Sequence, residues 1–292
     1  MTKKIKNQQI GLTLFFIILC ALILIPFILL VSISFSNEQA IAREGYSLIP
    51  RQFDLAAYKY VFRNPQTILN AYKVTFIFSV VGTFLSVFFM TLLGYMLSRK
   101  GIPGKSAVSF YIYFTMLFGG GLVPTYILIT QYLNLGNTIW VYILPGLISP
   151  WYVFMIRTFF QGIPYELTES AMIDGANEYQ IYGRIYIPCS KPVIATVTLF
   201  MFLAKWNDWY TAMLYISDES LMSLQYMLQR ILQNAAALQN AKLGTIVIDY
   251  SQLPTETMRM AMAVVVAGPA LIVFPFFQKY FVKGITVGSV KG

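Results

Sequence analysis

The chain has 292 residues, of which 57% are hydrophobic and 11% are charged; because a soluble domain has about a quarter of its residues charged, this composition indicates a membrane protein. Histidine is absent and cysteine occurs only twice, which excludes histidine-based catalysis, the common zinc sites and a disulfide framework. The formal net charge is +9, but the basic residues are spread along the chain, which argues against a nucleic-acid partner and fits cytoplasmic loops that face anionic lipid.

The first predicted element is a long apolar run at residues 10–34, behind a short basic leader. A secretory signal peptide is the competing interpretation, but this run is longer than the apolar region of such a peptide and no A-x-A cleavage site follows. The run is therefore predicted to remain as a transmembrane helix. Lys3, Lys4 and Lys6 are expected to hold the amino terminus in the cytoplasm.

Five further apolar segments follow, each close to the ~20 residues that cross ~30 Å of hydrocarbon. In the third span, Gly119-Gly120-Gly121 and Pro124 predict a broken or widened helix. Six crossings return both termini to the same side of the membrane. The chain is thus predicted to be an all-α membrane protein with one transmembrane domain, residues 1–292. The five later spans are placed at residues 70–97, 107–130, 137–160, 192–215 and 256–278.

The basic residues predict the sides of the membrane. Residues 161–191 are assigned to a cytoplasmic loop and residues 217–255 to a long outer loop. More Lys and Arg residues then lie on the cytoplasmic side than on the outer side, and several of the outer ones fall in long segments, which the positive-inside rule weighs less. The distribution favours a multi-pass protein of the cell membrane with both termini in the cytoplasm.

The loop at residues 161–191 is a polar stretch between two apolar spans. Pro164 followed by acidic residues is typical of a helix start, because proline is tolerated in the first turn and carboxylates suit the positive end of the helix dipole. Gly175 can leave that helix with a positive φ, and the residues after it can form a second short helix that Pro188 stops. The loop is therefore predicted to fold as helix, turn, helix. Its acidic residues are Glu166, Glu169, Asp174 and Glu178.

Within this loop the sequence reads Glu169-Ser170-Ala171, three residues, Gly175, nine residues, and then Ile185-Tyr186-Ile187-Pro188. This spacing resembles the EAA loop of permease subunits of ATP-binding-cassette (ABC) importers, whose pattern is EAA, three residues, G, nine residues, I-x-L-P. The sequence departs from that pattern at Ser170, where the family has alanine, and at Ile187, where it has leucine. An ordinary amphipathic connector between spans is the alternative interpretation.

The resemblance implies the type I permease fold of ABC importers. It also implies that the loop carries a coupling helix, which docks into a cleft of a cytoplasmic ATPase. Glu169 is then expected to pair with a basic group of the ATPase, and Gly175 is expected to supply the turn. The implied ATPase-coupling residues are Glu169, Ser170, Ala171, Met172, Asp174, Gly175 and Ala176.

The fifth span contains the polar and aromatic run Lys205-Trp206-Asn207-Asp208-Trp209-Tyr210. Charged groups inside a membrane are costly and should pair or face water, and Lys205 and Asp208 can pair at i, i+3. Aromatic rings beside amide and carboxylate groups also suit sugar recognition. An interfacial Trp/Tyr belt with a snorkelling lysine is the competing interpretation. The candidate substrate-pathway residues are Trp206, Asn207, Asp208 and Trp209.

Further stretches narrow the resemblance. GGGLVPTY, NTIWVYILPG and KWNDW resemble the Gram-positive branch of carbohydrate importers that handles complex oligosaccharides. The carboxyl-terminal FVKGITVGSVKG resembles the tail of the maltose-type second permease subunit, which reaches between the ATPases; a disordered, solvated end is the alternative. In maltose-type permeases the outer loop before the last span also reaches toward the binding protein. The implied ATPase contacts of the tail are Lys283, Gly284, Gly288 and Lys291, and the implied binding-protein contacts are Leu243, Gly244, Thr245 and Ile246.

Together these resemblances imply a transmembrane permease subunit of an ATP-driven, binding-protein-dependent oligosaccharide importer, without catalytic residues of its own. The implied partners are a second homologous permease subunit, two ATP-binding-cassette ATPases, an extracellular sugar-binding protein, the oligosaccharide and membrane lipid. No cofactor or metal is expected in this chain, because ATP and Mg²⁺ belong to the ATPases. Two alternatives stay open: an ABC permease for a non-sugar solute, and a membrane sensor or scaffold that binds a signalling partner through the cytoplasmic loop.

Overall fold

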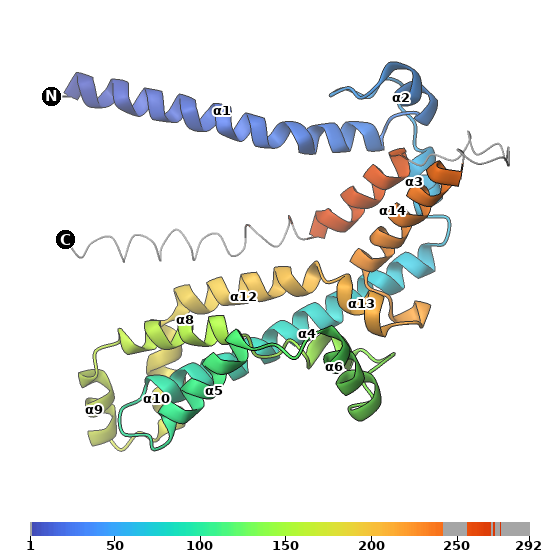
Figure 1. Ribbon diagram of the computed structural model, residues 1–292. Coiled ribbons are helices and arrows are strands. Elements are labelled where there is room, and N and C mark those ends of the chain that lie inside the picture. Colours follow the sequence, from blue (N-terminus) through green and yellow to red (C-terminus); the bar gives the residue numbers. More distant parts are fainter. Residues whose placement is uncertain (1, 242–255, 270, 272–274, 276–292) are drawn as a thin grey trace. The chain divides into compact units, whose positions relative to one another are not determined.

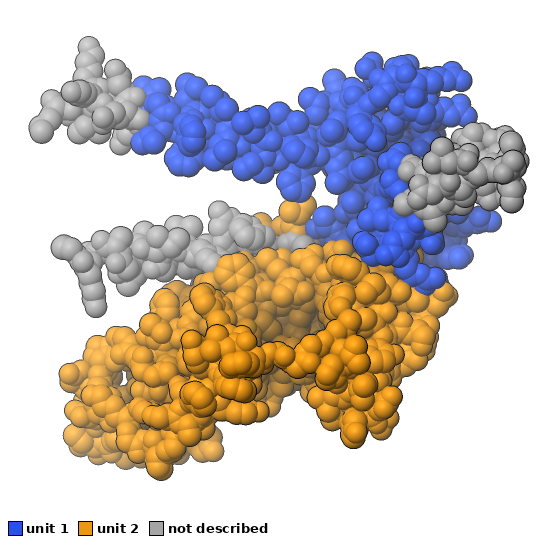
Figure 2. Space-filling model, in the orientation of Figure 1, with its two compact units in different colours: residues 1–68, 228–269 blue, residues 69–227, 270–292 orange. Residues whose placement is uncertain are grey.

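The computed structural model describes residues 2–241, 256–269, 271 and 275 (Figure 1). These residues form helices and no strand; an isolated antiparallel bridge joins Ser36 and Phe53. They belong to two compact units, which Figure 2 colours separately. The first unit comprises residues 1–68 and 228–269, and the second comprises residues 69–227 and 270–292. The helical structure agrees with the all-α class predicted from the sequence.

In the first unit, long-range contacts organise the chain around helix α2 (Glu38–Glu44). The Asn37 side chain caps this helix, because its Oδ1 accepts the N–H groups of Gln39 (3.0 Å) and Ala40 (3.3 Å). The Glu38 carboxylate in turn accepts the N–H groups of residues 256 (3.0 Å) and 257 (2.9 Å), at the start of the helix over residues 256–269. A carboxylate at a helix amino terminus suits the helix dipole. The other helices of this unit are α1 (Thr2–Ser34), α3 (Ala56–Val61) and the part of α14 (Leu224–Ala241) from residue 228 onward.

The second unit is built along α4 (Pro65–Ser98), whose first residues belong to the first unit. After α4 the described helices are shorter, and several are separated by only a few residues. In chain order they are α5 (Lys105–Leu117), α6 (Leu122–Ile127), η1 (Leu128–Tyr132), α7 (Trp140–Ile143), α8 (Pro150–Gln161), α9 (Glu166–Ile173), α10 (Glu178–Ile181), η2 (Tyr182–Tyr186), α11 (Ile187–Cys189), α12 (Lys191–Trp206), α13 (Tyr210–Tyr215), η3 (Glu219–Leu221) and the start of α14, residues 224–227.

Within the described residues, two helical segments are long and apolar enough to cross a membrane: Ile10–Ser34 of α1, and α4. They lie where the first two spans are expected. The number rises to four if two bent helix pairs each count as one span: Lys105–Leu117 with Leu122–Tyr132, bent by 114°, and Glu178–Cys189 with Lys191–Trp206, bent by 82°. The first bend contains the expected break, where Gly121 has a φ of +83°. Six spans and their orientation stay a prediction.

The segment expected as the fourth span, residues 137–160, is not one continuous helix. Helix α7 ends at Ile143 and α8 begins at Pro150. Proline explains both boundaries: Pro145 lacks the N–H that would continue α7, whereas Pro150 suits the first helical position of α8. The fifth expected span is also divided, because α12 ends at Trp206. Of the sixth, the structure describes residues 256–269, 271 and 275.

Two apolar clusters form the core of the second unit. In the first, the carboxyl-terminal half of α4 packs on α8 so closely that a Cβ at Gly94 would lie 2.7 Å from Ile156 Cγ2. In the second, the rings of Phe78 on α4 and Tyr142 on α7 stack with their centroids 4.3 Å apart. Helix α4 thus contacts the core along much of its length. Buried members of the first cluster include Met90, Leu97, Val153, Phe160, Val193 and Val197.

Candidate functional site

The first arm of the 161–191 loop folds as the sequence predicts. Helix α9 begins at Glu166, two residues after Pro164, and carries Glu166 and Glu169 in its first turn. At its end, the N–H of Ala176 donates to the carbonyl of Ala171 (2.9 Å), and the N–H of Gly175 donates to that of Met172 (3.0 Å). These two bonds define a Schellman motif, and the φ of +78° at Gly175 is the left-handed conformation that the motif requires.

The second arm begins with a capping box. Asn177 Oδ1 accepts the N–H of Gln180 (2.9 Å), and Gln180 Oε1 accepts the N–H of Asn177 (3.0 Å). Helix α10 continues through η2 and α11 as far as Cys189, so the predicted stop at Pro188 is wrong by about one residue. The reason is the π-helical turn of η2, which widens the helix just before the proline and gives its ring room.

The two faces of α9 differ. Thr168 is fully buried and its hydroxyl lies 3.2 Å from the hydroxyl of Tyr186, while Ala171 and Ala176 pack against the first apolar cluster. The predicted coupling residues Glu169, Ser170, Met172, Asp174 and Gly175 are exposed.

The tip of this loop also exposes apolar side chains that the sequence analysis did not select. Ile173 is 86% exposed and Tyr179 is 83% exposed, on either side of the Gly175 turn. Large apolar side chains rimmed by acidic residues are typical of a protein-binding surface. The signal was present in the sequence: an isoleucine and a tyrosine flank the predicted turn in an otherwise polar loop.

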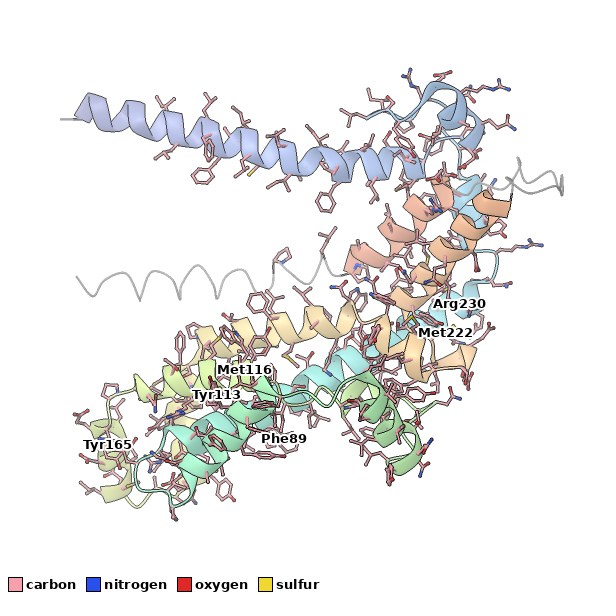
Figure 3. All side chains as sticks on the ribbon, viewed as in Figure 1. Phe89, Tyr113, Met116, Tyr165, Met222 and Arg230 are labelled. Atoms are coloured by element: carbon pink, nitrogen blue, oxygen red, sulfur yellow. The ribbon has the colours of Figure 1, made fainter. Side chains whose placement is uncertain are left out.

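The 161–191 loop is attached to the carboxyl-terminal end of α4. Arg99 Nη2 donates to Glu178 Oε1 (2.7 Å), and the Tyr95 hydroxyl donates to Glu178 Oε2. Burial alone would raise the pKa of the Glu178 carboxyl, but the hydrogen bonds from Arg99 and Tyr95 hold it below its ordinary value. Tyr165, labelled in Figure 3, lies under the Lys100 ammonium at 4.4 Å from ring centroid to Nζ. The sequence analysis assigned no role to Tyr95 or Arg99.

The candidate substrate-pathway residues surround a break in the helices at residues 207–209. Asn207 is exposed; its Nδ2 donates to the Leu203 carbonyl (2.8 Å), and its Oδ1 accepts from Gln225 Nε2 (2.9 Å). Asp208 Oδ1 accepts the N–H of Thr211 (3.0 Å) in the first turn of α13. The 207–209 break is therefore a capped, ordered turn between α12 and α13.

The two tryptophans beside the break have different environments. Trp206 is 2% exposed and stacks on Phe202 at 5.8 Å between centroids. Trp209 is half-buried and meets Tyr210 edge-on at 5.8 Å. Of the four candidates, Asn207, Asp208 and Trp209 are thus accessible in this chain, and Trp206 is part of its core.

Lys205 and Asp208 do not form the expected ion pair. The helix ends at Trp206, so Asp208 does not lie on the same helical face as Lys205. Lys205 is 6% exposed, and its ammonium donates instead to the carbonyl oxygen of Tyr142 (3.2 Å). The side chain passes directly over Gly82 of α4, where a Cβ would lie 2.8 Å from Lys205 Cε.

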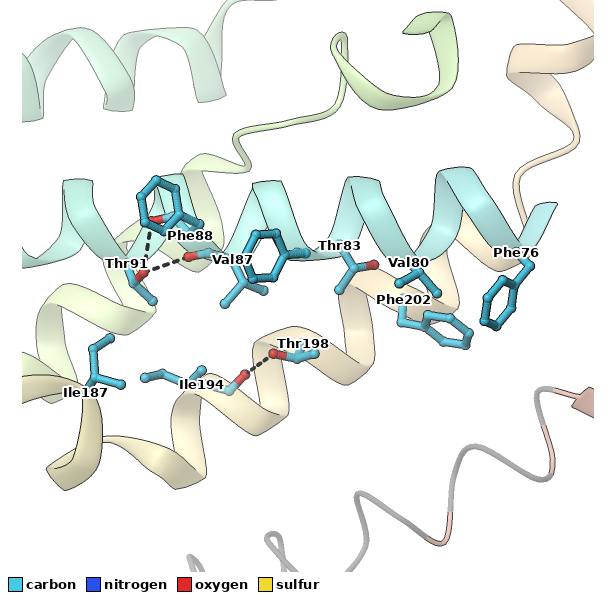
Figure 4. A pocket seen from close by; sticks show the side chains of 11 residues that line it. Phe76, Val80, Thr83, Val87, Phe88, Thr91, Ile187, Ile194, Thr198 and Phe202 are labelled. Carbon is cyan, nitrogen blue, oxygen red and sulfur yellow. Dashed lines mark hydrogen bonds between the residues drawn. The ribbon is translucent and has the colours of Figure 1, made fainter. Parts of the chain in front are cut away.

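A cavity of about 530 Å³ lies between α4 and α12 (Figure 4). Its lining is mostly apolar, with hydroxyls from Thr83, Thr91 and Thr198; Thr91 and Thr198 donate theirs to backbone carbonyls of their own helices. This chemistry does not match a sugar, which needs several free polar partners. Among the residues that the structure describes, no three His, Cys, Asp or Glu side chains gather as metal ligands would. The predicted contacts at Leu243–Ile246 and at Lys283–Lys291 lie outside the described residues.

Comparison with known proteins places these features in a family. Residues 72–287 match the family described as "Binding-protein-dependent transport system inner membrane component". The chain is 39% identical to protein LplC of Bacillus subtilis over 93% of its own length and 90% of that protein. It is 38% identical to the polygalacturonan/rhamnogalacturonan transport system permease protein YtcP of the same organism, over 97% of this chain and 96% of YtcP.

A solved structure shows the same fold. The chain superposes with a TM-score of 0.78 and 28% identity on a chain from a bacterial ABC transporter that imports the acidic polysaccharide alginate, over 95% of this chain and 97% of that one. The expected type I permease fold is thereby confirmed, and so is the expectation of a transport subunit rather than an enzyme. The chain therefore belongs to the family of binding-protein-dependent transport system inner membrane components, the membrane-embedded permeases of ABC importers.

Proposed function

We propose that this chain is the permease subunit of an ATP-driven importer of oligosaccharides, and that its substrates carry uronic acid units. The observation that best supports the permease role is the 161–191 loop. In a chain of the permease family, this loop forms a capped helix–turn–helix with an exposed tip of apolar and acidic residues. The substrate class is supported by two relatives whose names refer to polygalacturonan and to alginate, both acidic polysaccharides.

The tip of the 161–191 loop is the proposed docking surface for the ATPase. Ile173 and Tyr179 supply apolar area, and Glu169 pairs with a basic group of the ATPase. The Schellman turn at Gly175 makes the tip a fixed shape, so a push from the ATPase moves the loop as one body. The other proposed coupling residues, Ser170, Ala171, Met172, Asp174 and Ala176, either line this surface or seat it on the core.

The remaining assignments follow from this role. Both termini lie in the cytoplasm, and Lys283, Gly284, Gly288 and Lys291 of the tail contact the ATPases, which hold ATP and Mg²⁺. A second permease completes the pathway, and an extracellular sugar-binding protein delivers the substrate near Leu243, Gly244, Thr245 and Ile246. Asn207, Asp208 and Trp209 offer an amide, a carboxylate and a ring to passing sugar.

The test is reconstitution. The chain, co-purified with its ATPases and second permease, is placed in lipid vesicles with the sugar-binding protein, and ATP-dependent uptake of labelled solutes is measured. Oligogalacturonides are expected to enter, whereas neutral arabino-oligosaccharides and amino acids are not. Uptake of neutral sugars alone would contradict the acidic substrate class. A chain that co-purifies with no ATPase would contradict the transport role and favour the sensor alternative.

A further inference from the structure

The contact between α4 and the second arm of the 161–191 loop is built from two matching stripes. Thr91 and Tyr95 of α4 and Arg99, the residue just after it, follow one another at four-residue intervals. The Arg99 N–H still donates to the Tyr95 carbonyl (3.2 Å), so the three side chains share one helical face. On the continuous helix from α10 through η2, Glu178, Tyr182 and Tyr186 have the same spacing. We call these six residues the α4 clamp.

The two stripes are in direct contact. The hydroxyls of Thr91 and Tyr182 lie 2.7 Å apart, and the Tyr95 ring packs against those of Tyr182 (5.3 Å between centroids) and Tyr186 (4.8 Å). At the end of the clamp, the Arg99–Glu178 ion pair closes the contact, with the second Glu178 oxygen held by Tyr95.

The ion pair joins a buried group to an exposed one. The Arg99 side chain is 4% exposed, whereas that of Glu178 is 56% exposed. Removing Glu178 would therefore leave a buried guanidinium without its counter-charge, which is far more costly than losing a surface ion pair. Apolar residues of the loop already pack against α4 and α8 in the first apolar cluster. The Arg99–Glu178 ion pair is therefore an additional contact, beyond the apolar packing that holds the loop in place.

The other part of α4 contacts the 207–209 break and its surroundings. Gly82 touches Lys205 and Phe78 stacks on Tyr142. Thr75 Oγ1 accepts the N–H of Leu224 (2.9 Å), at the start of the helix that supplies Gln225 to Asn207. Helix α4 is uninterrupted from Gly82 to its last residue, Ser98, which is roughly 24 Å at 1.5 Å per residue, and Arg99 follows directly.

We propose that the α4 clamp ties the ATPase-facing loop to α4, so that movement of the loop is transmitted along α4 to Lys205 and the 207–209 break. Arg99 and Glu178 are positioning residues in this device, and neither touches substrate or ATP. The inference rests on the proposed permease function, which supplies the moving ATPase. The test is a charge-reversal cycle, which measures the energetic coupling between the two residues.

The experiment uses the full importer in lipid vesicles and measures ATP hydrolysis and sugar uptake in the same sample. Glu178→Gln, Arg99→Gln and the reversals Glu178→Arg and Arg99→Glu are each expected to lower the number of sugars imported per ATP by about tenfold, within the usual range of coupling between sites. Tyr95→Phe, which removes one hydrogen bond to Glu178, is expected to have a smaller effect in the same direction. The double variant Glu178→Arg with Arg99→Glu restores the ion pair and should recover most of the ratio.

Lys73→Gln is the matched control, because it removes a positive charge from an exposed position on the same helix and should leave the ratio unchanged. Variants that lose uptake and ATP hydrolysis in parallel, or a double variant no better than the single ones, would overturn the clamp as a transmission device. Where a variant assembles poorly, the number of sugars imported per ATP is measured on the assembled fraction alone, and the same two outcomes support or overturn the clamp. Failure of the wild-type importer to take up any oligosaccharide would count against the proposed function instead.

Discussion

The 161–191 loop and the 207–209 break both interrupt the helices of the second unit, and both are ordered by hydrogen-bonded caps. In the loop, the capping partners lie within five residues of one another: Gly175 and Ala176 close one helix, and Asn177 with Gln180 opens the next. At the break, Asn207 and Asp208 each make one local bond, but distant residues also hold them: Gln225 donates to the Asn207 side chain, and the Ser223 hydroxyl donates to the Asp208 carbonyl (2.9 Å).

This difference has a mechanical meaning. A turn whose caps are local keeps its shape when its surroundings move, which suits a part that another protein pushes. A turn held by a helix start fifteen or more residues away changes shape when that helix moves. The first region is therefore suited to receiving force, and the second to changing conformation.

The largest expected effect comes from the loop. Gly175→Val places a β-branched side chain at a φ of +78°, which costs about 1–2 kcal/mol or more and should distort the docking tip. Uptake is expected to fall at least tenfold while ATP hydrolysis persists, as measured in reconstituted vesicles. Gly45→Val is the control, because Gly45 has a φ of +76° outside the loop. Equal losses of uptake from both variants would show general misfolding rather than uncoupling.

The next effect concerns the break. Gly82→Val sets a side chain against the end of the Lys205 side chain, which must move, and a buried ammonium that loses its hydrogen-bond partner costs about 1–3 kcal/mol. Displacement of the lysine should also free the Tyr142 carbonyl. Thermal unfolding in nanodiscs is expected to shift to lower temperature, whereas Gly268→Val, at a helical glycine with open space, should not produce such a shift. An unchanged unfolding temperature for Gly82→Val would mean that Lys205 is not held in place by α4.

A smaller effect separates local from distant caps. Asn177→Ala removes the capping box and should destabilise the second arm by ~1 kcal/mol. Because the cap is local, hydrogen exchange is expected to rise only in residues 177–189 and not in α12 or α14. Faster hydrogen exchange spread over the whole second unit would contradict the local nature of this cap.

The smallest effect on stability is expected at Asn207. Asn207→Ala removes an exposed side chain with two hydrogen bonds, each with a net worth of about 1 kcal/mol or less. Hydrogen exchange should rise both at the break and at the start of α14. This differs from Asn177→Ala, for which the rise is expected to stay within one segment. If Asn207 also contacts sugar, the apparent affinity for substrate in uptake assays should weaken; normal uptake would remove Asn207 from the pathway.

Much of the 161–191 loop was determined by sequence alone, because its chemistry is local. The acidic start of α9, the left-handed turn at Gly175 and the second short helix all depend on residues a few positions apart. The exposed tip follows from the same pattern, although Ile173 and Tyr179 were not selected from it. The exact end of the second arm was missed, since a π-helical turn leaves no simple mark in the sequence.

Only the tertiary structure decided which distant residues meet. The spacing of Lys205 and Asp208 suggested an ion pair, but the helix ends between them and Lys205 crosses Gly82 to reach a carbonyl on α7. The pairing of Arg99 with Glu178 joins residues 79 positions apart. A periodic sequence pattern identifies the face of a helix, whereas the partner of that face depends on how the helices pack, and a single sequence carries no direct record of that packing.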